Sequence, residues 1–177
     1  MKQMTIKEKL IEGNRNFLAT SDQNLREQAA VNGQHPYAIV ICCSDSRVIP
    51  EQIFSASVGE LFVIRVAGNV LDKHQLGSIE YAAAHLECKL ILLLGHTGCG
   101  AIAAALSGHV DGFISYITDD IQEAIGEERD PDRACRLNVR HGVERIRKEF
   151  DQHPEMPDVE IRGAVYDIQS GEVEWLL

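Results

Sequence analysis

A short apolar strand that ends in reactive side chains is the feature that most limits how this chain can fold. Residues 38–41 are aliphatic, and a polar turn follows at once. That turn carries a thiol (Cys43), a carboxylate (Asp45) and a guanidinium (Arg47) at alternate positions. Open α/β sheets build sites in this way, because ligands bind beyond the carboxyl ends of their strands. The stretch therefore predicts a site at a sheet edge.

A second strand end of the same kind comes later in the chain. Residues 89–94 form an almost continuous aliphatic run, which is typical of a central parallel strand buried on both faces. A glycine-rich loop follows, and it contains His96 and Cys99. Because parallel strands end at the same edge of a sheet, the two loops can converge.

Apolar runs and helical patterns alternate along the chain, which predicts right-handed βαβ units and a mainly parallel sheet. Strands are expected at 37–42, 61–66 and 89–94, with a closing hairpin of 159–167 and 173–176. Helices are expected at 5–18, within 21–34, and at 49–54, 76–86, 101–106, 113–125 and 132–150. The fold class is α/β: a central sheet flanked by helices. We expect a single domain over 1–177, with an N-terminal helical arm at 1–35 and the core at 36–177.

Composition and charge limit the partners of this chain. Its 177 residues suit one domain with a real core. A formal net charge of −10 argues against nucleic acid and against an anionic membrane surface. The first residues lack the apolar segment of a signal peptide, and no apolar run approaches the roughly 18 residues of a membrane span. We therefore expect a cytoplasmic protein whose five cysteines are reduced thiols, available to bind metal.

His96 and Cys99 are three residues apart, and Cys43 offers a third soft ligand from the other strand end. Two thiolates and an imidazole suit zinc, and three protein ligands leave a fourth position open, as in catalytic sites. Taken alone, a cysteine at a strand end is more often a small buried apolar residue, and a single His-x-x-Cys pair is a weak signal. Alternation along a strand sends Cys42 and Cys43 to opposite faces, so Cys42 is expected to be a buried thiol. The same expectation holds for Cys88 and Cys135.

The two motifs together are more specific than either alone. Cys-Ser-Asp-Ser-Arg at 43–47, followed by Gly-His-Thr-Gly-Cys-Gly at 95–100, resembles the β-class carbonic anhydrases, whose signatures are C-x-D-x-R and H-x-x-C. Further segments resemble that family in the same order, at 59–65, 78–82, 138–140 and 163–168. The resemblance implies Zn²⁺ held by Cys43, His96 and Cys99. It also implies reversible hydration of CO2 to bicarbonate and a proton by zinc-bound hydroxide.

The resemblance also implies roles for residues around the metal. Asp45 and Arg47 become a catalytic dyad, in which Arg47 holds Asp45 away from the metal and Asp45 accepts the proton of the hydroxide. In a closed form known in part of the family, Asp45 is itself the fourth ligand. Five further positions match substrate-binding residues of the family. Gln34 and Gly100 would bind a substrate oxygen, and the apolar CO2 pocket would be lined by Phe62, Ala67 and Tyr81.

Family members form dimers by exchanging the N-terminal helix, with active sites at the subunit boundary. The resemblance therefore implies a homodimer or tetramer in which Gln34 and Tyr81 serve the neighbouring subunit's zinc. Two other functions remain open from sequence. One is hydrolysis of carbonyl sulfide or carbon disulfide at the same zinc site. The other is a non-catalytic, zinc-stabilised interaction protein with Asp45 as a permanent ligand.

Overall fold

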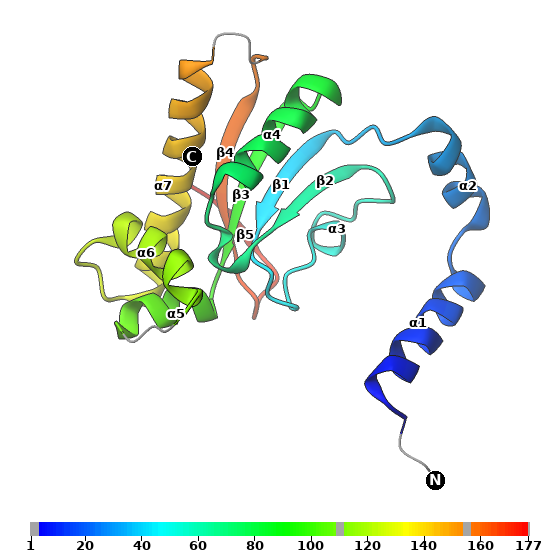
Figure 1. Cartoon of the computed structure of the whole chain (residues 1–177), viewed down its shortest axis with the longest axis horizontal. Coiled ribbons are helices and arrows are strands. Elements are labelled where there is room, and N and C mark those ends of the chain that lie inside the picture. The colour runs from blue at the N-terminus through cyan, green and yellow to red at the C-terminus, as the bar shows by residue number, and fades with distance from the viewer. Residues whose placement is uncertain (1–3, 109–111, 154–156, 177) are drawn as a thin grey trace. The chain divides into compact units, whose positions relative to one another are not determined.

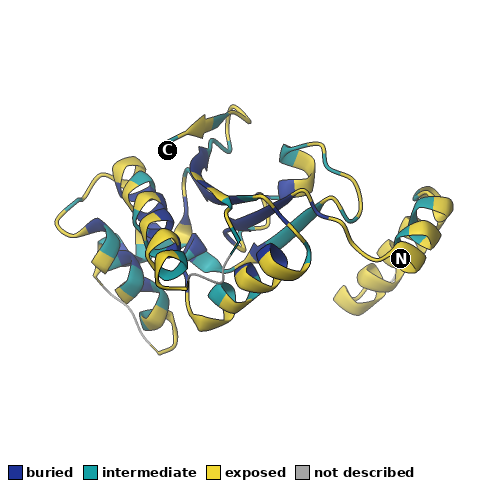
Figure 2. Cartoon of the chain, turned by 90° about the horizontal axis from the view of Figure 1, so that it is seen from above, coloured by how far each residue is buried: buried dark blue, intermediate teal, exposed yellow. Residues whose placement is uncertain are grey.

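The computed structural model describes residues 4–108, 112–153 and 157–176, and it divides into two compact units between Gln34 and His35. The first unit holds α1 (Ile6–Thr20) and α2 (Gln23–Asn32). A capping box begins α1: Thr5 Oγ1 accepts from the Glu8 N–H at 3.2 Å, and the Glu8 carboxylate accepts from the Thr5 N–H at 2.7 Å. Neither helix contains a buried residue (Figure 2).

The second unit is built on a five-stranded sheet in the order β2-β1-β3-β4-β5 (Figure 1). The first four strands are parallel, and the last pairs antiparallel with its neighbour as the closing hairpin. The strands are β1 (Ala38–Cys42), β2 (Leu61–Arg65), β3 (Leu90–His96), β4 (Glu160–Tyr166) and β5 (Val173–Trp175). The predicted α/β class with a mainly parallel sheet is confirmed.

Helices follow most strands, as βαβ units require. They are α3 (Pro50–Ile53), α4 (Lys73–His85), α5 (Gly100–Ser107), α6 (Ile114–Ile125) and α7 (Pro131–Gln152), with a short 3₁₀ turn at Ala67–Asn69. The expected start of the fourth helix at residue 76 is wrong. Asp72 accepts hydrogen bonds from the N–H groups of His74 and Gln75, and this capping box begins the helix ahead of its apolar residues.

The core lies on both faces of the sheet. One face packs against α4 and α7 through side chains such as Ile79 and Val143, and the other packs around Val48 and the residues that follow β4. Buried residues concentrate on the strands and on the helix faces that meet them (Figure 2). The expectation that Cys42 points away from Cys43 is confirmed, because they belong to different core clusters.

The strand register brings the two predicted loops to one edge. Cys42, the last residue of β1, pairs with Arg65 on one side and with Leu94 on the other. β3 runs two residues further and ends at His96, opposite Tyr166. The residues after β1, β2 and β3 therefore leave the sheet side by side.

Candidate metal centre

Three side chains converge at this edge. Cys43 directly follows β1, His96 ends β3, and Cys99 occupies the N-cap position of α5. One ligating atom from each lies within 4.8 Å of the others, and the two sulfur atoms are 4.0 Å apart. All three residues are buried, with exposed fractions of 5, 0 and 6%. The loops that the sequence placed at one edge thus form a single cluster.

The state of His96 indicates what the cluster can hold. Its Nδ1 lies 2.9 Å from the carbonyl oxygen of Thr97. With the ring proton donated there, the lone pair is on Nε2, which is buried and has no hydrogen-bond partner among the described residues. A buried polar atom without a partner is costly, so this nitrogen fits a metal ligand. Two thiolates on a tetrahedral zinc stand roughly 3.8 Å apart, close to the observed separation.

The surroundings of Cys43 favour the thiolate that a metal requires. The Cys99 thiol donates to Cys43 Sγ, and the backbone N–H groups of Asp45 and Gly68 donate to the same sulfur. Together these hydrogen bonds outweigh burial and hold the pKa of Cys43 well below its usual range. The neighbouring Cys43 thiolate in turn raises the pKa of Cys99. Without a metal the pair therefore shares one proton, which metal binding would release.

Asp45 and Arg47 form a bidentate pair beside the cluster. Arg47 Nε donates to Asp45 Oδ1 at 2.9 Å, and Arg47 Nη2 donates to Oδ2 at 2.7 Å. The Arg47 backbone N–H adds a third hydrogen bond to Oδ1 at 2.9 Å. These contacts hold the pKa of Asp45 well below its usual range, so the carboxylate stays ionised. Arg47 also reaches the Gly98 carbonyl, in the loop between the other two cluster residues, at 3.3 Å.

One further residue contributes to this site, and sequence patterns alone did not indicate it. Arg65, at the end of β2, donates to the carbonyl oxygens of Cys43 at 3.3 Å and of Asp45 at 2.7 Å. It therefore fixes the backbone of the turn that carries the thiolate and the carboxylate. The sequence contained one sign of this role: Arg65 is a charged residue at the end of β2, the strand that pairs with β1.

The five substrate-pocket candidates divide into two groups. Ala67 and Gly100 lie at this edge, since Ala67 precedes the turn residue that contacts Cys43, and Gly100 follows Cys99. Phe62 lies three residues before the end of β2, roughly 10 Å back along the strand. Its ring is 6.2 Å from that of Tyr81, which is 47% exposed. Gln34 ends the first unit. Phe62 and Tyr81 thus lie away from the chain's own cluster.

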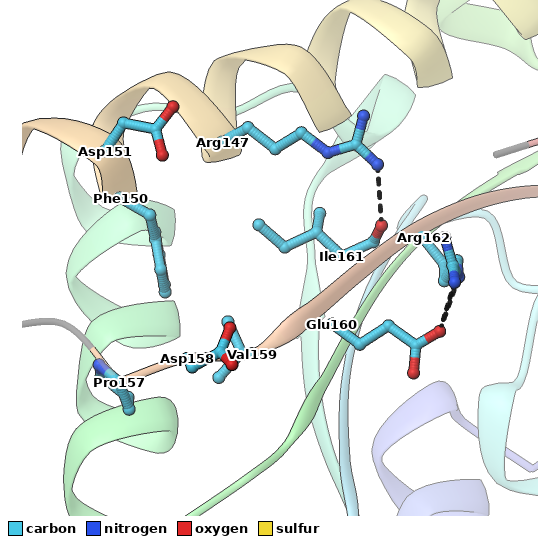
Figure 3. A pocket seen from close by; sticks show the side chains of 9 residues that line it. All are labelled: Arg147, Phe150, Asp151, Pro157, Asp158, Val159, Glu160, Ile161 and Arg162. Carbon is cyan, nitrogen blue, oxygen red and sulfur yellow. Dashed lines mark hydrogen bonds and ion pairs between the residues drawn. The ribbon is translucent and has the colours of Figure 1, made fainter.

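A separate hollow lies at the start of β4 (Figure 3). Its volume is about 440 Å³, and α7 and β4 supply most of its lining. Glu160 begins β4 opposite Leu90, six residues before the His96 pairing, so the hollow lies at the opposite end of the sheet from the cluster. The charged groups in it are partly satisfied already: Arg147 donates to the Ile161 carbonyl at 3.1 Å, and Arg162 pairs with Glu160. It has no connection with the metal cluster.

Comparison with known proteins identifies the family of this chain. The family profile described as carbonic anhydrase matches residues 38–173, from the first residue of β1 to the first of β5. The chain belongs to the β-class carbonic anhydrase family. Among its relatives is carbonic anhydrase 2 of Mycobacterium tuberculosis, 38% identical over 150 residues, which cover 81% of this chain and 69% of the relative.

Solved structures of the family share the fold. A β-carbonic anhydrase of Aspergillus fumigatus superposes with a TM-score of 0.84 at 27% identity, covering 97% of this chain and 91% of that one. A tetrameric β-carbonic anhydrase of Sordaria macrospora gives a TM-score of 0.77 at 28% identity, covering 97 and 98%. In the described part of the present chain, no helix has both the length and the apolar character needed to cross a membrane.

Proposed function

We propose that this chain catalyses the reversible hydration of CO2 to bicarbonate and a proton, with Zn²⁺ held by Cys43, His96 and Cys99. The observation that carries the proposal is the buried cluster itself, in which two sulfur atoms and an imidazole nitrogen lie within 4.8 Å of one another. Membership of the β-class family supports the same reaction.

CO2 is uncharged and weakly electrophilic, so the reaction needs a strong nucleophile and an apolar place for the substrate. When bound, zinc supplies the Lewis acidity that makes water a nucleophile near neutral pH, as in carbonic anhydrases with three histidine ligands. Asp45 accepts a hydrogen bond from the attacking water and directs its lone pair toward carbon. Arg47 keeps this carboxylate ionised and oriented through its bidentate contact.

The substrate would lie against Ala67, with the backbone N–H of Gly100 directed at a CO2 oxygen. Gly100 is the first residue of α5, and the N–H groups of a first helical turn have no partner within their helix. Asp45 engages Arg47 with both oxygens, which suits a catalytic acceptor better than a permanent metal ligand. The geometry thus favours catalysis over the purely structural zinc site.

We further propose that a second copy of the chain completes each site. Phe62 and Tyr81 form an aromatic pair away from their own cluster, and Tyr81 is half exposed. The arm α1 presents several large apolar side chains that are not buried, among them Ile6 and Leu10. A homodimer or tetramer that exchanges residues 1–35 would cover such surfaces and bring Gln34, Phe62 and Tyr81 to the neighbour's zinc. The tetrameric relative from Sordaria macrospora supports this arrangement.

The same proposal treats residues 1–177 as one β-carbonic-anhydrase-like domain, with 36–177 as its core. We place it in the cytoplasm because its five cysteines are free thiols, as is usual in a reducing compartment.

A metal analysis combined with stopped-flow CO2 hydration tests the function. We expect about one zinc per chain, and we expect Cys43→Ser to lose both zinc and activity. Sulfide release from carbonyl sulfide, measured on the same preparation, should be slow relative to CO2 hydration. A fully active Cys43→Ser protein would contradict the assignment of the site, and faster turnover of carbonyl sulfide would contradict the assigned substrate.

A further inference from the structure

The turn at Ala67–Asn69 makes a direct contact with the metal cluster. The Gly68 N–H donates to Cys43 Sγ at 3.3 Å. To do so the backbone takes a left-handed conformation at two successive residues, with φ of 68° at Gly68 and 45° at Asn69. Asparagine tolerates this region better than most residues, but the conformation still costs free energy. Other contacts must therefore hold the turn in place.

Asn138 makes such a contact from a distant part of the chain. Its Nδ2 donates to the Gly68 carbonyl oxygen at 2.8 Å, and only 5% of the residue is exposed. A buried hydrogen bond of this kind fixes the peptide group whose carbonyl accepts it, because breaking it would leave two polar groups unsatisfied. Asn138 thus holds the residue whose N–H contacts the thiolate.

The same face of α7 also supports the second ligand strand. Cys135, one helical turn before Asn138, donates its S–H to the His96 carbonyl oxygen at 3.2 Å. Side chains three residues apart lie next to each other on a helix, so one strip of α7 contacts the backbone behind both ligand segments. Asn138 belongs to the family-like segment 138–140, to which the sequence assigns no role.

We propose that Asn138 is a positioning residue of the metal centre, because it keeps the Gly68 N–H directed at Cys43 Sγ. An N–H donor withdraws electron density from a thiolate. This withdrawal matters in a site with two thiolate ligands, because the negative charge of the thiolates makes the metal a weaker Lewis acid. Groups of this kind, one contact removed from the ligands, orient the ligands and tune the metal. The inference rests on the proposed zinc function.

Cobalt(II) tests this role, because its thiolate-to-metal absorption band reports the electron density on sulfur. We compare the wild type with Asn138→Ala and with Asn138→Ser, whose hydroxyl is one bond too short to reach Gly68. Val143→Ala is the matched control, as it removes buried atoms from the same helix without touching the turn. The Asn138 variants should shift the band to lower energy and retain cobalt roughly tenfold more weakly against a chelator. Val143→Ala should do neither.

The outcomes separate the two proposals. If the wild type takes up no cobalt with a thiolate band, the zinc function fails. The other negative outcome is that the wild type takes up cobalt with a thiolate band while the Asn138 variants match Val143→Ala in band position and in cobalt retention. In that case Asn138 contributes only to core packing, and the positioning role is overturned. Should Asn138→Ala fold poorly, Asn138→Ser gives the same reading with a polar group kept at the buried position.

Discussion

Arg47 holds both carboxylate oxygens of Asp45, at 2.9 and 2.7 Å, and its backbone N–H adds a third contact. The pair comes from a single turn, so the position of this carboxylate depends on two residues and on the strand that precedes them. Arg65 then fixes that turn from the neighbouring strand. The acceptor that the reaction needs is therefore in place in the isolated chain.

Asp45→Asn should keep the metal and lose turnover. An amide is nearly the same shape as a carboxylate, but it is uncharged and accepts a hydrogen bond from the attacking water less strongly. We expect zinc content equal to that of the wild type and a kcat for CO2 hydration lower by roughly 10²–10³-fold, the usual cost of losing one preorganised hydrogen-bond partner of the transition state. Stopped-flow rates on preparations of measured zinc content decide the matter. Near-normal rates would remove Asp45 from the mechanism.

The thiols of the metal-free protein should differ sharply in reactivity. Hydrogen bonds from the Cys99 thiol and from two backbone N–H groups hold the pKa of Cys43 well below its usual range, whereas burial raises the pKa of Cys42 to about 12 and that of Cys135 to about 11. Iodoacetamide at neutral pH should therefore label Cys43 first. Peptide mapping by mass spectrometry measures the order, and zinc should protect Cys43. Equal labelling of Cys42 would contradict these environments.

Much of this arrangement could be predicted from local sequence. The apolar runs ending at Cys42 and Leu94 predicted parallel strands, and strand alternation separated Cys42 from Cys43. The start of α4 was missed because its first turn is polar, although Asp72 provides the cap. Local patterns carry such information because they arise from neighbouring residues.

Other features depend on contacts between distant residues. Asn138 and Gly68 are 70 positions apart, and only the fold shows that they meet. The left-handed turn at Gly68 follows from packing and hydrogen bonding that no spacing encodes. A polar residue on the apolar face of the helix predicted at 132–150 was the one available sign, and it does not name a partner.

Gly68→Ala should destabilise the protein through packing as well as through backbone conformation. An added Cβ would stand 2.8 Å from Ile121 Cδ1 and 3.0 Å from Ala101 Cβ. Gly108→Ala is a matched control, because Gly108 has a similar φ of 67° but open space around its Cβ position. Urea unfolding should show a loss of about 1 kcal/mol for the control and about 3 kcal/mol for Gly68→Ala. Equal losses of unfolding free energy in the two variants would show that Ile121 and Ala101 can move away from the added Cβ at little cost.

Asp120 should make the protein less stable as the pH rises. Burial raises the pKa of this carboxyl, and Arg145 opposes the effect only in part, with its nearest nitrogen 3.9 Å away. The native state then binds the proton more tightly than the unfolded state. The contribution of Asp120 is fully present below the ordinary Asp pKa of about 3.9 and is lost as pH rises through the higher native value.

Unfolding free energies of the wild type and Asp120→Asn, measured from pH 3.5 to 7, test this dependence. The wild type should lose stability relative to the variant across the lower part of that range. Asp119→Asn changes the charge equally at an exposed neighbouring position, and it serves as the control. A difference that is flat, or that grows in favour of the wild type, would contradict the prediction.

Hybrid dimers test whether Tyr81 acts on the neighbouring subunit's site. Cys43→Ser destroys the metal site of its own chain but leaves Tyr81 intact, whereas Tyr81→Ala does the reverse. Coexpression with two affinity tags yields a hybrid in which one metal site is complete only if Tyr81 reaches across the interface. We then expect about half of the wild-type activity per dimer, because a two-fold dimer has two equivalent sites.

A hybrid of Cys43→Ser with wild type gives the reference value. If Tyr81 serves its own chain instead, the Cys43→Ser and Tyr81→Ala hybrid will be no more active than the Tyr81→Ala parent.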